Sequence, residues 1–275
     1  MISIKINIKV VILAIFIAIL MYPRTIEILI KSVKDIKTAK KLSSSTVKIN
    51  NAVIDTDKCK IVFMFDGGWA SVYSDAYEVM KKYNYKGNVS VIPSRIDEKQ
   101  FMSYQQLSDL YLQGWDLINH SYTHKGNIYD KTDELLSDFN RARQWMQNRY
   151  IGKLSDMLVM PFGEINPYLI TQLKDAGYRN VRTSENIINL DGYKIEYYPV
   201  MTVNLLTDVT TEEVEGILTD ITYKSKVVII ILNKIGDKDD GSGMTYSKDQ
   251  FEKILMFINQ HSDEFQVINY SQLFE

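Results

Sequence analysis

The chain has 275 residues, 45% of them hydrophobic and 24% charged, which suits a globular protein and argues against disorder. Lysine and arginine (32) nearly balance aspartate and glutamate (34), so no basic excess exists to drive nucleic-acid binding. The single cysteine excludes an intrachain disulfide and the zinc sites built from several thiolates, so a metal site would need histidine and carboxylate ligands.

The first 23 residues predict a membrane anchor. Lys5 and Lys9 precede an uncharged, almost wholly apolar run at 10–22, which is the order of a signal sequence. The run is short for a full span of about 17–25 residues, but isoleucines before it extend it. No small-x-small cleavage site follows, which favours an uncleaved anchor over a removed signal peptide. The basic N-terminus should stay inside, so we expect a membrane-anchored protein with an extracytoplasmic domain.

Residues 24–57 predict a juxtamembrane connector. Apolar residues recur at roughly helical spacing among lysines at 24–41, and a polar stretch follows at 42–46. This pattern indicates a short surface helix and then a flexible tether. We expect the folded domain to begin near residue 58 and to continue to residue 275.

Strand and helix patterns alternate about six times through that domain, which predicts an α/β fold. Such alternation is typical of a barrel or of a doubly wound sheet. The predicted strands cover 60–65, 87–93, 115–118, 157–160, 181–183, 227–232 and 265–268. The predicted helices cover 69–85, 104–113, 130–150, 167–176, 211–223 and 248–260.

Side chains that can do chemistry follow two of these strands. Asp66 ends the first strand, and His120 and His124 come directly after the third. If the strands are parallel and share one sheet, the three residues lie on the same rim. A spacing of four on a helical turn places both imidazoles on one face, where they can hold one metal ion. The alternative is a capped turn, with Asn119 or Ser121 as the cap.

Three motifs resemble those of the polysaccharide deacetylase family (NodB homology, carbohydrate esterase type 4). They are Phe-Asp-Gly-Gly at 65–68, His-Ser-Tyr-Thr-His at 120–124 and Pro-Phe-Gly at 161–163. The resemblance covers residues 58–275 and implies a distorted (β/α) barrel. It also implies a hydrolase that removes N- or O-acetyl groups from peptidoglycan, chitin-like or exopolysaccharide sugars. The family uses one divalent ion, which we expect to be zinc.

The resemblance assigns a role to each motif. His120 and His124 would bind the metal, Asp66 would take a proton from the metal-bound water, and Arg182 would orient Asp66. A cation polarises the acetyl carbonyl and acidifies its bound water, and a nearby carboxylate completes the deprotonation. The sugar groove would be lined by Pro161, Phe162 and Gly163, and an exposed aromatic such as Trp69 or Phe162 would stack on a sugar unless it belongs to the core.

Two positions depart from the family pattern. Gly67 stands where the family has a second, metal-binding aspartate, so Asp66 itself could become the ligand. Asn233 stands where the family has a histidine that serves as general acid. An asparagine can donate a hydrogen bond to an oxyanion but cannot deliver a proton, so we place Asn233 among the substrate contacts. These changes leave three hypotheses: an altered deacetylase, a glycan-binding module without turnover, and an anchor protein whose histidines only form a turn.

Overall fold

The computed structural model describes residues 23–45, 54–55, 57–126, 132–190, 200–221 and 227–274. The chain divides into two compact units, Met1–Ser44 and Ser45–Glu275. Apart from Pro23, the predicted anchor lies outside the described residues. Within those residues, no helix is both long enough and apolar enough to cross a membrane. The anchor therefore stays a prediction.

In the first unit, α2 (Pro23–Ser44) is the predicted surface helix. It runs further than the sequence indicated, into the polar stretch that we predicted to be a tether. The hydroxyls of Ser43 and Ser44 donate to the Lys40 carbonyl at 2.9 and 3.0 Å. Because these side chains bond to the preceding turn, the serines continue the helix instead of breaking it.

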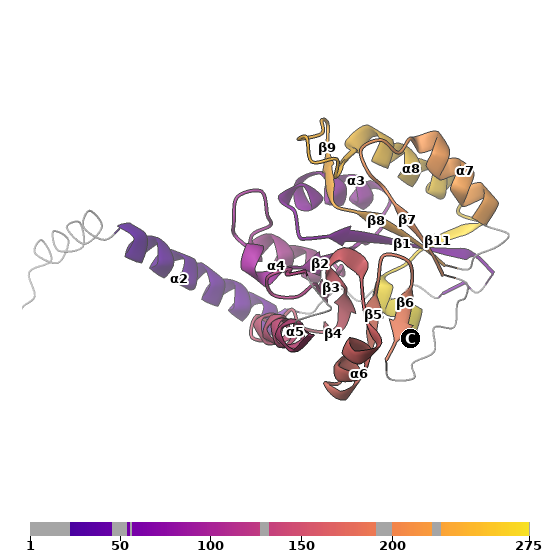
Figure 1. The fold of residues 1–275 in the computed structure, drawn as a ribbon. Coiled ribbons are helices and arrows are strands. Elements are labelled where there is room, and N and C mark those ends of the chain that lie inside the picture. The colour runs from indigo at the N-terminus through magenta and orange to yellow at the C-terminus, as the bar shows by residue number, and fades with distance from the viewer. Residues whose placement is uncertain are drawn as a thin grey trace, which may run out of the picture. The chain divides into compact units, whose positions relative to one another are not determined.

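The second unit is built on a sheet that holds nine strands among the described residues, in the order β6-β5-β4-β3-β2-β1-β8-β7, with β11 also paired to β1 (Figure 1). Neighbouring strands in this sheet are parallel except β5 and β6. Its strands are β1 Cys59–Asp66, β2 Asn88–Val91, β3 Asp116–Asn119, β4 Leu154–Val159, β5 Asn180–Arg182, β6 Ile187–Asn189, β7 Val200–Asn204, β8 Val227–Leu232 and β11 Phe265–Val267. A separate pair joins β9 (Lys234–Gly236) to β10 (Thr245–Ser247).

Helices follow the strands in the predicted order. The α-helices of this unit are α3 Tyr77–Lys82, α4 Tyr104–Leu112, α5 Thr132–Gln147, α6 Pro167–Asp175, α7 Thr211–Ile221 and α8 Lys248–Gln260. Figure 1 shows α7 and α8 together on the side of β7 and β8, and α5 and α6 beside β4 and β5. The helix predicted at 69–85 is shorter than expected, because a π-helical turn at Val72–Ala76 precedes α3. Strands β6, β7, β9 and β10 were not predicted.

The sheet curls into a near-closed barrel. Ile187 of β6 and Ile229 of β8 belong to one buried apolar cluster, although several strands separate them in the sheet order. Near the open side, the hydroxyl of Thr202 in β7 donates to the carbonyl of Ser184, which precedes β6, at 2.9 Å. The architecture is therefore a mixed α/β barrel, consistent with the predicted distorted (β/α) barrel.

The short helix η4 (Tyr270–Phe274) fills one part of the barrel interior. Its backbone N–H groups at Tyr270 and Ser271 donate to Asn88 Oδ1 and Asp116 Oδ2, at 2.7 and 2.8 Å. The Tyr270 hydroxyl donates to Asn180 Oδ1 at 2.9 Å. Burial raises the pKa of Asp116, and the Ser271 N–H opposes that rise. Inward polar residues of β2, β3 and β5 thus hold this plug.

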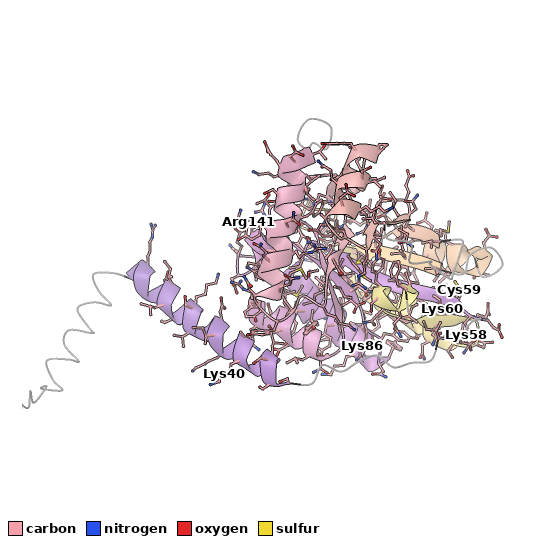
Figure 2. All side chains as sticks on the ribbon, turned by 90° about the horizontal axis from the view of Figure 1, so that it is seen from below. Lys40, Lys58, Cys59, Lys60, Lys86 and Arg141 are labelled. Carbon is pink, nitrogen blue, oxygen red and sulfur yellow. The ribbon has the colours of Figure 1, made fainter. Side chains whose placement is uncertain are left out.

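The two-residue period of β1 decides which side chains enter the barrel. Val62 and Met64 point into the inner cluster, whereas Phe63 packs edge-on against Phe251 of α8. Asp66 therefore faces inward at the carboxyl end of the strand. Figure 2 labels Cys59 at the opposite end of β1. Its thiol is buried, which raises its pKa to about 11 and leaves it in the unreactive protonated form.

Candidate functional site

Four strands of the barrel bring polar side chains to one rim. Asp66 ends β1, Ser90 lies near the end of β2, His120 directly follows β3, and Arg182 ends β5. The strands are parallel, so their carboxyl ends meet at the same edge. Each residue also continues the inward set of its strand, as His120 does after Ile118. The structure thus brings together the predicted Asp66, His120 and Arg182, and adds Ser90.

The Asp66 carboxylate is held through both oxygens. The Arg182 guanidinium pairs with Oδ2, and the Ser90 hydroxyl donates to Oδ1 at 3.0 Å. The Asp66 side chain is 17% exposed, whereas that of Arg182 is only 4% exposed. Water and ligands can therefore reach the carboxylate, while the cation that fixes it stays buried beneath. Arg182 thus contacts the carboxylate that we predicted it to orient, and its orienting role stays a prediction.

The two histidines face each other across a loop. Their ring centroids lie 4.6 Å apart, with the rings inclined at 69°. The helical turn that we predicted for them is wrong, because Ser121 and His124 adopt positive φ angles of 60° and 54°. Side chains shape the loop: Asn119 Oδ1 accepts from the Ser121 N–H at 3.0 Å, and Ser121 Oγ accepts from the His124 N–H at 2.9 Å. The residues predicted as caps therefore hold the pair in place.

The surroundings of the histidines favour neutral rings. His120 Nδ1 lies 2.8 Å from the Val159 carbonyl, which can only accept, so Nδ1 carries the proton and Nε2 keeps its lone pair. Burial lowers the pKa of His120 to about 4, although the nearby Asp66 opposes that change. The pKa of His124 is also lowered, chiefly by burial. Neutral imidazole with a free lone pair is the form that binds metals.

The histidine pair could supply two metal ligands, whereas Gly67 stands at the position of the third ligand that the resemblance implies. Across the described ranges, no group of three or more His, Cys, Asp or Glu side chains is arranged to hold an ion. At Gly67, φ is +96°, and a Cβ would lie 2.9 Å from the Trp69 Nε1 atom. The two histidines therefore provide only part of the ligands that a metal ion needs. The indole of Trp69 occupies the space that a side chain at residue 67 would need.

Trp69 contacts two protein groups through its ring. Its ring stacks on Phe101 at a centroid distance of 4.3 Å and an angle of 22°. The Lys234 ammonium lies 4.2 Å from the ring centroid. Protein groups therefore already occupy part of the indole surface, and the stacking of a sugar on Trp69 stays a prediction.

Phe162 offers the exposed aromatic face at this rim. It is 65% exposed, adopts a φ of 60°, and lies 4.7 Å from the His124 ring centroid. Pro161 before it is buried. Gly163 after it adopts a φ of +74°, and a Cβ there would lie 2.6 Å from the Ser184 side chain. The turn thus requires glycine and presents Phe162 beside the histidines, as a sugar-binding surface needs.

Asn233 reaches the same rim from the other side of β1. It directly follows β8, where Leu232 pairs with Phe65, the residue before Asp66. The remaining histidine, His261, is elsewhere, at the end of α8, where its Nδ1 lies 2.9 Å from the Phe257 carbonyl. His261 therefore belongs to a helix end and not to the site.

Some residues that hold the predicted site residues in place were not predicted from the sequence. Ser90 could have been found, because it lies two positions after Asn88 and so shares its inward face. Asp138 Oδ2 accepts from the Thr123 N–H and hydroxyl, at 2.8 and 3.0 Å, and so braces the histidine loop. Nothing in the sequence identifies that contact or the Val159 carbonyl, because both depend on tertiary packing.

Residues 54–181 match the family model described as polysaccharide deacetylase. The predicted resemblance to the polysaccharide deacetylase family is confirmed. The match contains Asp66, the histidine pair and the turn at 161–163, and it ends just before Arg182. Two of the curated relatives are poly-β-1,6-N-acetyl-D-glucosamine N-deacetylases. The one from Staphylococcus epidermidis is 26% identical over 127 residues, and the one from Staphylococcus aureus (strain MSSA476) is 23% identical over 129 residues.

These matches cover 41% and 42% of this chain and 44% of each relative, so they span less than half of those proteins. Solved structures show the same fold over a longer stretch. The Bc1960 peptidoglycan N-acetylglucosamine deacetylase has a TM-score of 0.55 at 15% identity, covering 78% of this chain and 88% of that one. A family 4 acetyl xylan esterase from Clostridium thermocellum, in complex with a cobalt ion, has a TM-score of 0.54 at 16% identity, covering 78% and 90%.

Proposed function

We propose that this polysaccharide deacetylase-like protein is a metal-dependent hydrolase that removes acetyl groups from an amino-sugar polysaccharide. The observation that carries the proposal is the shared rim of Asp66, held by Arg182 and Ser90, and a pair of neutral histidines. The two staphylococcal relatives are named as N-deacetylases, which favours hydrolysis of an amide C–N bond.

Each residue of the site has a chemical role in this proposal. His120 and His124 hold a divalent ion, which we expect to be zinc, although the esterase of similar fold holds cobalt. Such an ion supplies polarisation of the acetyl carbonyl and acidification of water. Asp66 accepts a proton from the attacking water, and Arg182 keeps the carboxylate directed toward the rim. Asn233 donates a hydrogen bond to an oxygen of the substrate.

The same assignment predicts slow turnover. Asn233 cannot protonate a departing amine, so that proton has to come from solvent. The missing ligand at Gly67 weakens the hold on the metal. Phe162 supplies an aromatic surface for a sugar next to the reacting group.

We further propose that the reaction takes place at the cell surface. The support is the order of charged and apolar residues in the first 23 positions, which is typical of an uncleaved export anchor. The substrate would be an acetylated glycan of the cell envelope, such as peptidoglycan or an exopolysaccharide.

Acetate release tests the proposal. The full chain is incubated with β-1,4- and β-1,6-linked N-acetylglucosamine oligomers and with peptidoglycan, in the presence of zinc, cobalt or manganese. We expect release from at least one substrate, stimulated by metal and abolished in His120→Ala. Metal titration by calorimetry should give one ion per chain, lost in the same variant. Absence of metal binding in the wild type would overturn the metallohydrolase assignment.

A second function is favoured by the changes at Gly67 and Asn233, namely glycan binding without turnover. The indole packed against Gly67 and the amide in place of an acid both remove reactive groups while leaving Phe162 exposed. Oligomer binding measured by calorimetry, with no acetate released under any metal, would select this function over hydrolysis.

A further inference from the structure

Helix α2 concentrates exposed apolar side chains. Eleven large hydrophobic side chains are exposed in the described part of the chain, and five of them lie on this one helix, at 46% to 66% exposure. The five are Ile28, Leu29, Ile30, Val33 and Ile36. Scattered exposed apolar residues need no explanation, but a cluster of this kind marks an interaction surface.

Three of these residues form a stripe along the helix. At 100° per residue, Leu29, Val33 and Ile36 fall within roughly 60° of one another, and Ile30 widens the stripe on one side. Lys34 lies beyond Ile30 on that side, whereas Lys37 falls between Val33 and Ile30 and Lys40 between Leu29 and Val33, so lysines both border and interrupt the apolar stripe. Figure 2 labels Lys40 in the later turns of the helix. The long stems of these lysines can lie along an apolar surface while their charges reach a polar layer.

The helix is also basic within an acidic chain. It carries five lysines and one arginine against one glutamate and one aspartate, a net charge of +4. The whole chain has a formal charge of −2, so the remainder carries −2 − 4 = −6. Residues 1–22 add +2 through Lys5 and Lys9, so the chain after Ser44 carries −6 − 2 = −8. The net attraction to an anionic surface therefore comes from α2 and the segment before it, whereas the net charge of the chain after Ser44 is repelled.

From these features we propose that α2 lies flat on an anionic lipid surface, with Leu29, Val33 and Ile36 inserted and its lysines at the phosphate groups. A helix that is amphipathic, basic and too polar to span a bilayer suits the boundary between headgroups and acyl chains. A second copy of the chain fits less well. The stripe covers only about two turns, whereas a coiled coil needs several heptads, and two helices of charge +4 repel each other.

Fluorescence of the full chain in lipid nanodiscs tests this placement whether or not residues 1–22 insert. The buried Cys59 is replaced (Cys59→Ala), and an environment-sensitive dye is attached at Val33→Cys or, as the matched control, at Asp35→Cys. Two residues correspond to 200° of rotation, so the two dyes point to nearly opposite sides of the helix. Discs of phosphatidylcholine alone are compared with discs that also contain phosphatidylglycerol.

We expect the dye at position 33 to shift to the blue and to be quenched by a lipid-borne quencher only in the anionic discs. Asp35 is half-buried on the side of α2 where Thr38 and Leu42 are buried, so the emission of the dye at position 35 should be the same in both kinds of disc. Replacing Lys34 and Lys37 by glutamine should lower the ratio of lipid-bound to free helix by about fivefold per lysine. A blue shift at position 33 without lipid would show that the stripe packs on protein, and equal signals at 33 and 35 would show no lipid-facing side. Either result overturns the proposal.

Discussion

The two halves of the barrel mouth are built differently. On the β2–β5 side of β1, inward strand-end residues are bonded to one another or to the backbone, as in the pairs Asp66–Arg182 and His120–Val159. On the β8 side, Asn233 is followed by β9, where Lys234 pairs with Asp240 at 2.6 Å and covers the Trp69 ring. The first half has Asp66, Arg182 and the histidine pair but glycine at residue 67, and the second half has Asn233 where the family resemblance implies an acid.

This difference indicates which side of the barrel mouth can carry the proposed hydrolysis. Parallel register and alternation force the strand-end residues of the first half into one place, so their function depends on few other residues. The second half depends on the segment after β8, which the sheet does not constrain. The proposed activity therefore rests on the first half, and substitutions in the two halves should differ in the size of their effects.

Asp66→Asn should cause the largest loss. The amide keeps the shape of the carboxylate but cannot accept the proton from water, so acetate release should fall by about 10²–10⁴-fold. Metal binding by the histidines should remain, as measured by calorimetry. Ser90→Ala removes the contact to Asp66 Oδ1 and the hydrogen bond that Ser90 Oγ accepts from the Gly67 N–H at 3.2 Å, and it serves as the milder comparison. An Asp66→Asn protein with wild-type turnover would place the base elsewhere.

Acid should destabilise the metal-free protein through His120. Its folded pKa of about 4 lies below the unfolded value near 6.5, so the unfolded state binds the proton first as the pH falls. Stability is therefore complete above about pH 6.5 and is lost toward pH 4, by about 2 kcal/mol between pH 7 and pH 5. Urea unfolding in the presence of a chelator measures this loss, and His120→Gln should remove it. An unchanged pH slope in that variant would contradict the role of His120.

Gly67 and Trp69 should behave as a coupled pair. A Cβ at residue 67 meets the indole nitrogen, and the φ of +96° adds strain, so Gly67→Ala should destabilise the fold by about 1–3 kcal/mol. In a Trp69→Ala background the contact is gone, and the same substitution should cost about 1 kcal/mol less. Urea unfolding of the four proteins gives the coupling. Additive effects would mean that the indole does not occupy this space.

Asn233→Ala should have the smallest effect on activity. It removes one hydrogen-bond donor and no proton donor, so acetate release should fall less than tenfold, the value of about one hydrogen bond. Asn233→His tests the opposite change and should raise the rate by supplying an acid. A large loss in Asn233→Ala would move the chemistry into the second half of the mouth.

The sequence predicted the parts of this site that follow from periodicity. The apolar runs of β1 and β8 are buried throughout or nearly so, which is why their ends, and hence Asp66 and Asn233, were placed well. β6 and β7 were missed for the opposite reason. β6 has three residues, and β7 is only partly buried, so neither shows a clear apolar period. The prediction of a helical turn at the histidine pair was wrong. The side chains of Asn119 and Ser121 bond to backbone N–H groups there and form a loop instead.

The plug formed by η4 has a consequence for how the protein is made. Asn88, Asp116 and Asn180 all bond to residues 270–271, so the barrel interior lacks these partners until that segment has been synthesised. A chain emerging from the ribosome therefore exposes three strands with unpaired inward polar groups, and cannot reach the native state early. Late closure of this kind would suit the export that we propose, because an export channel for unfolded chains needs the chain to stay open.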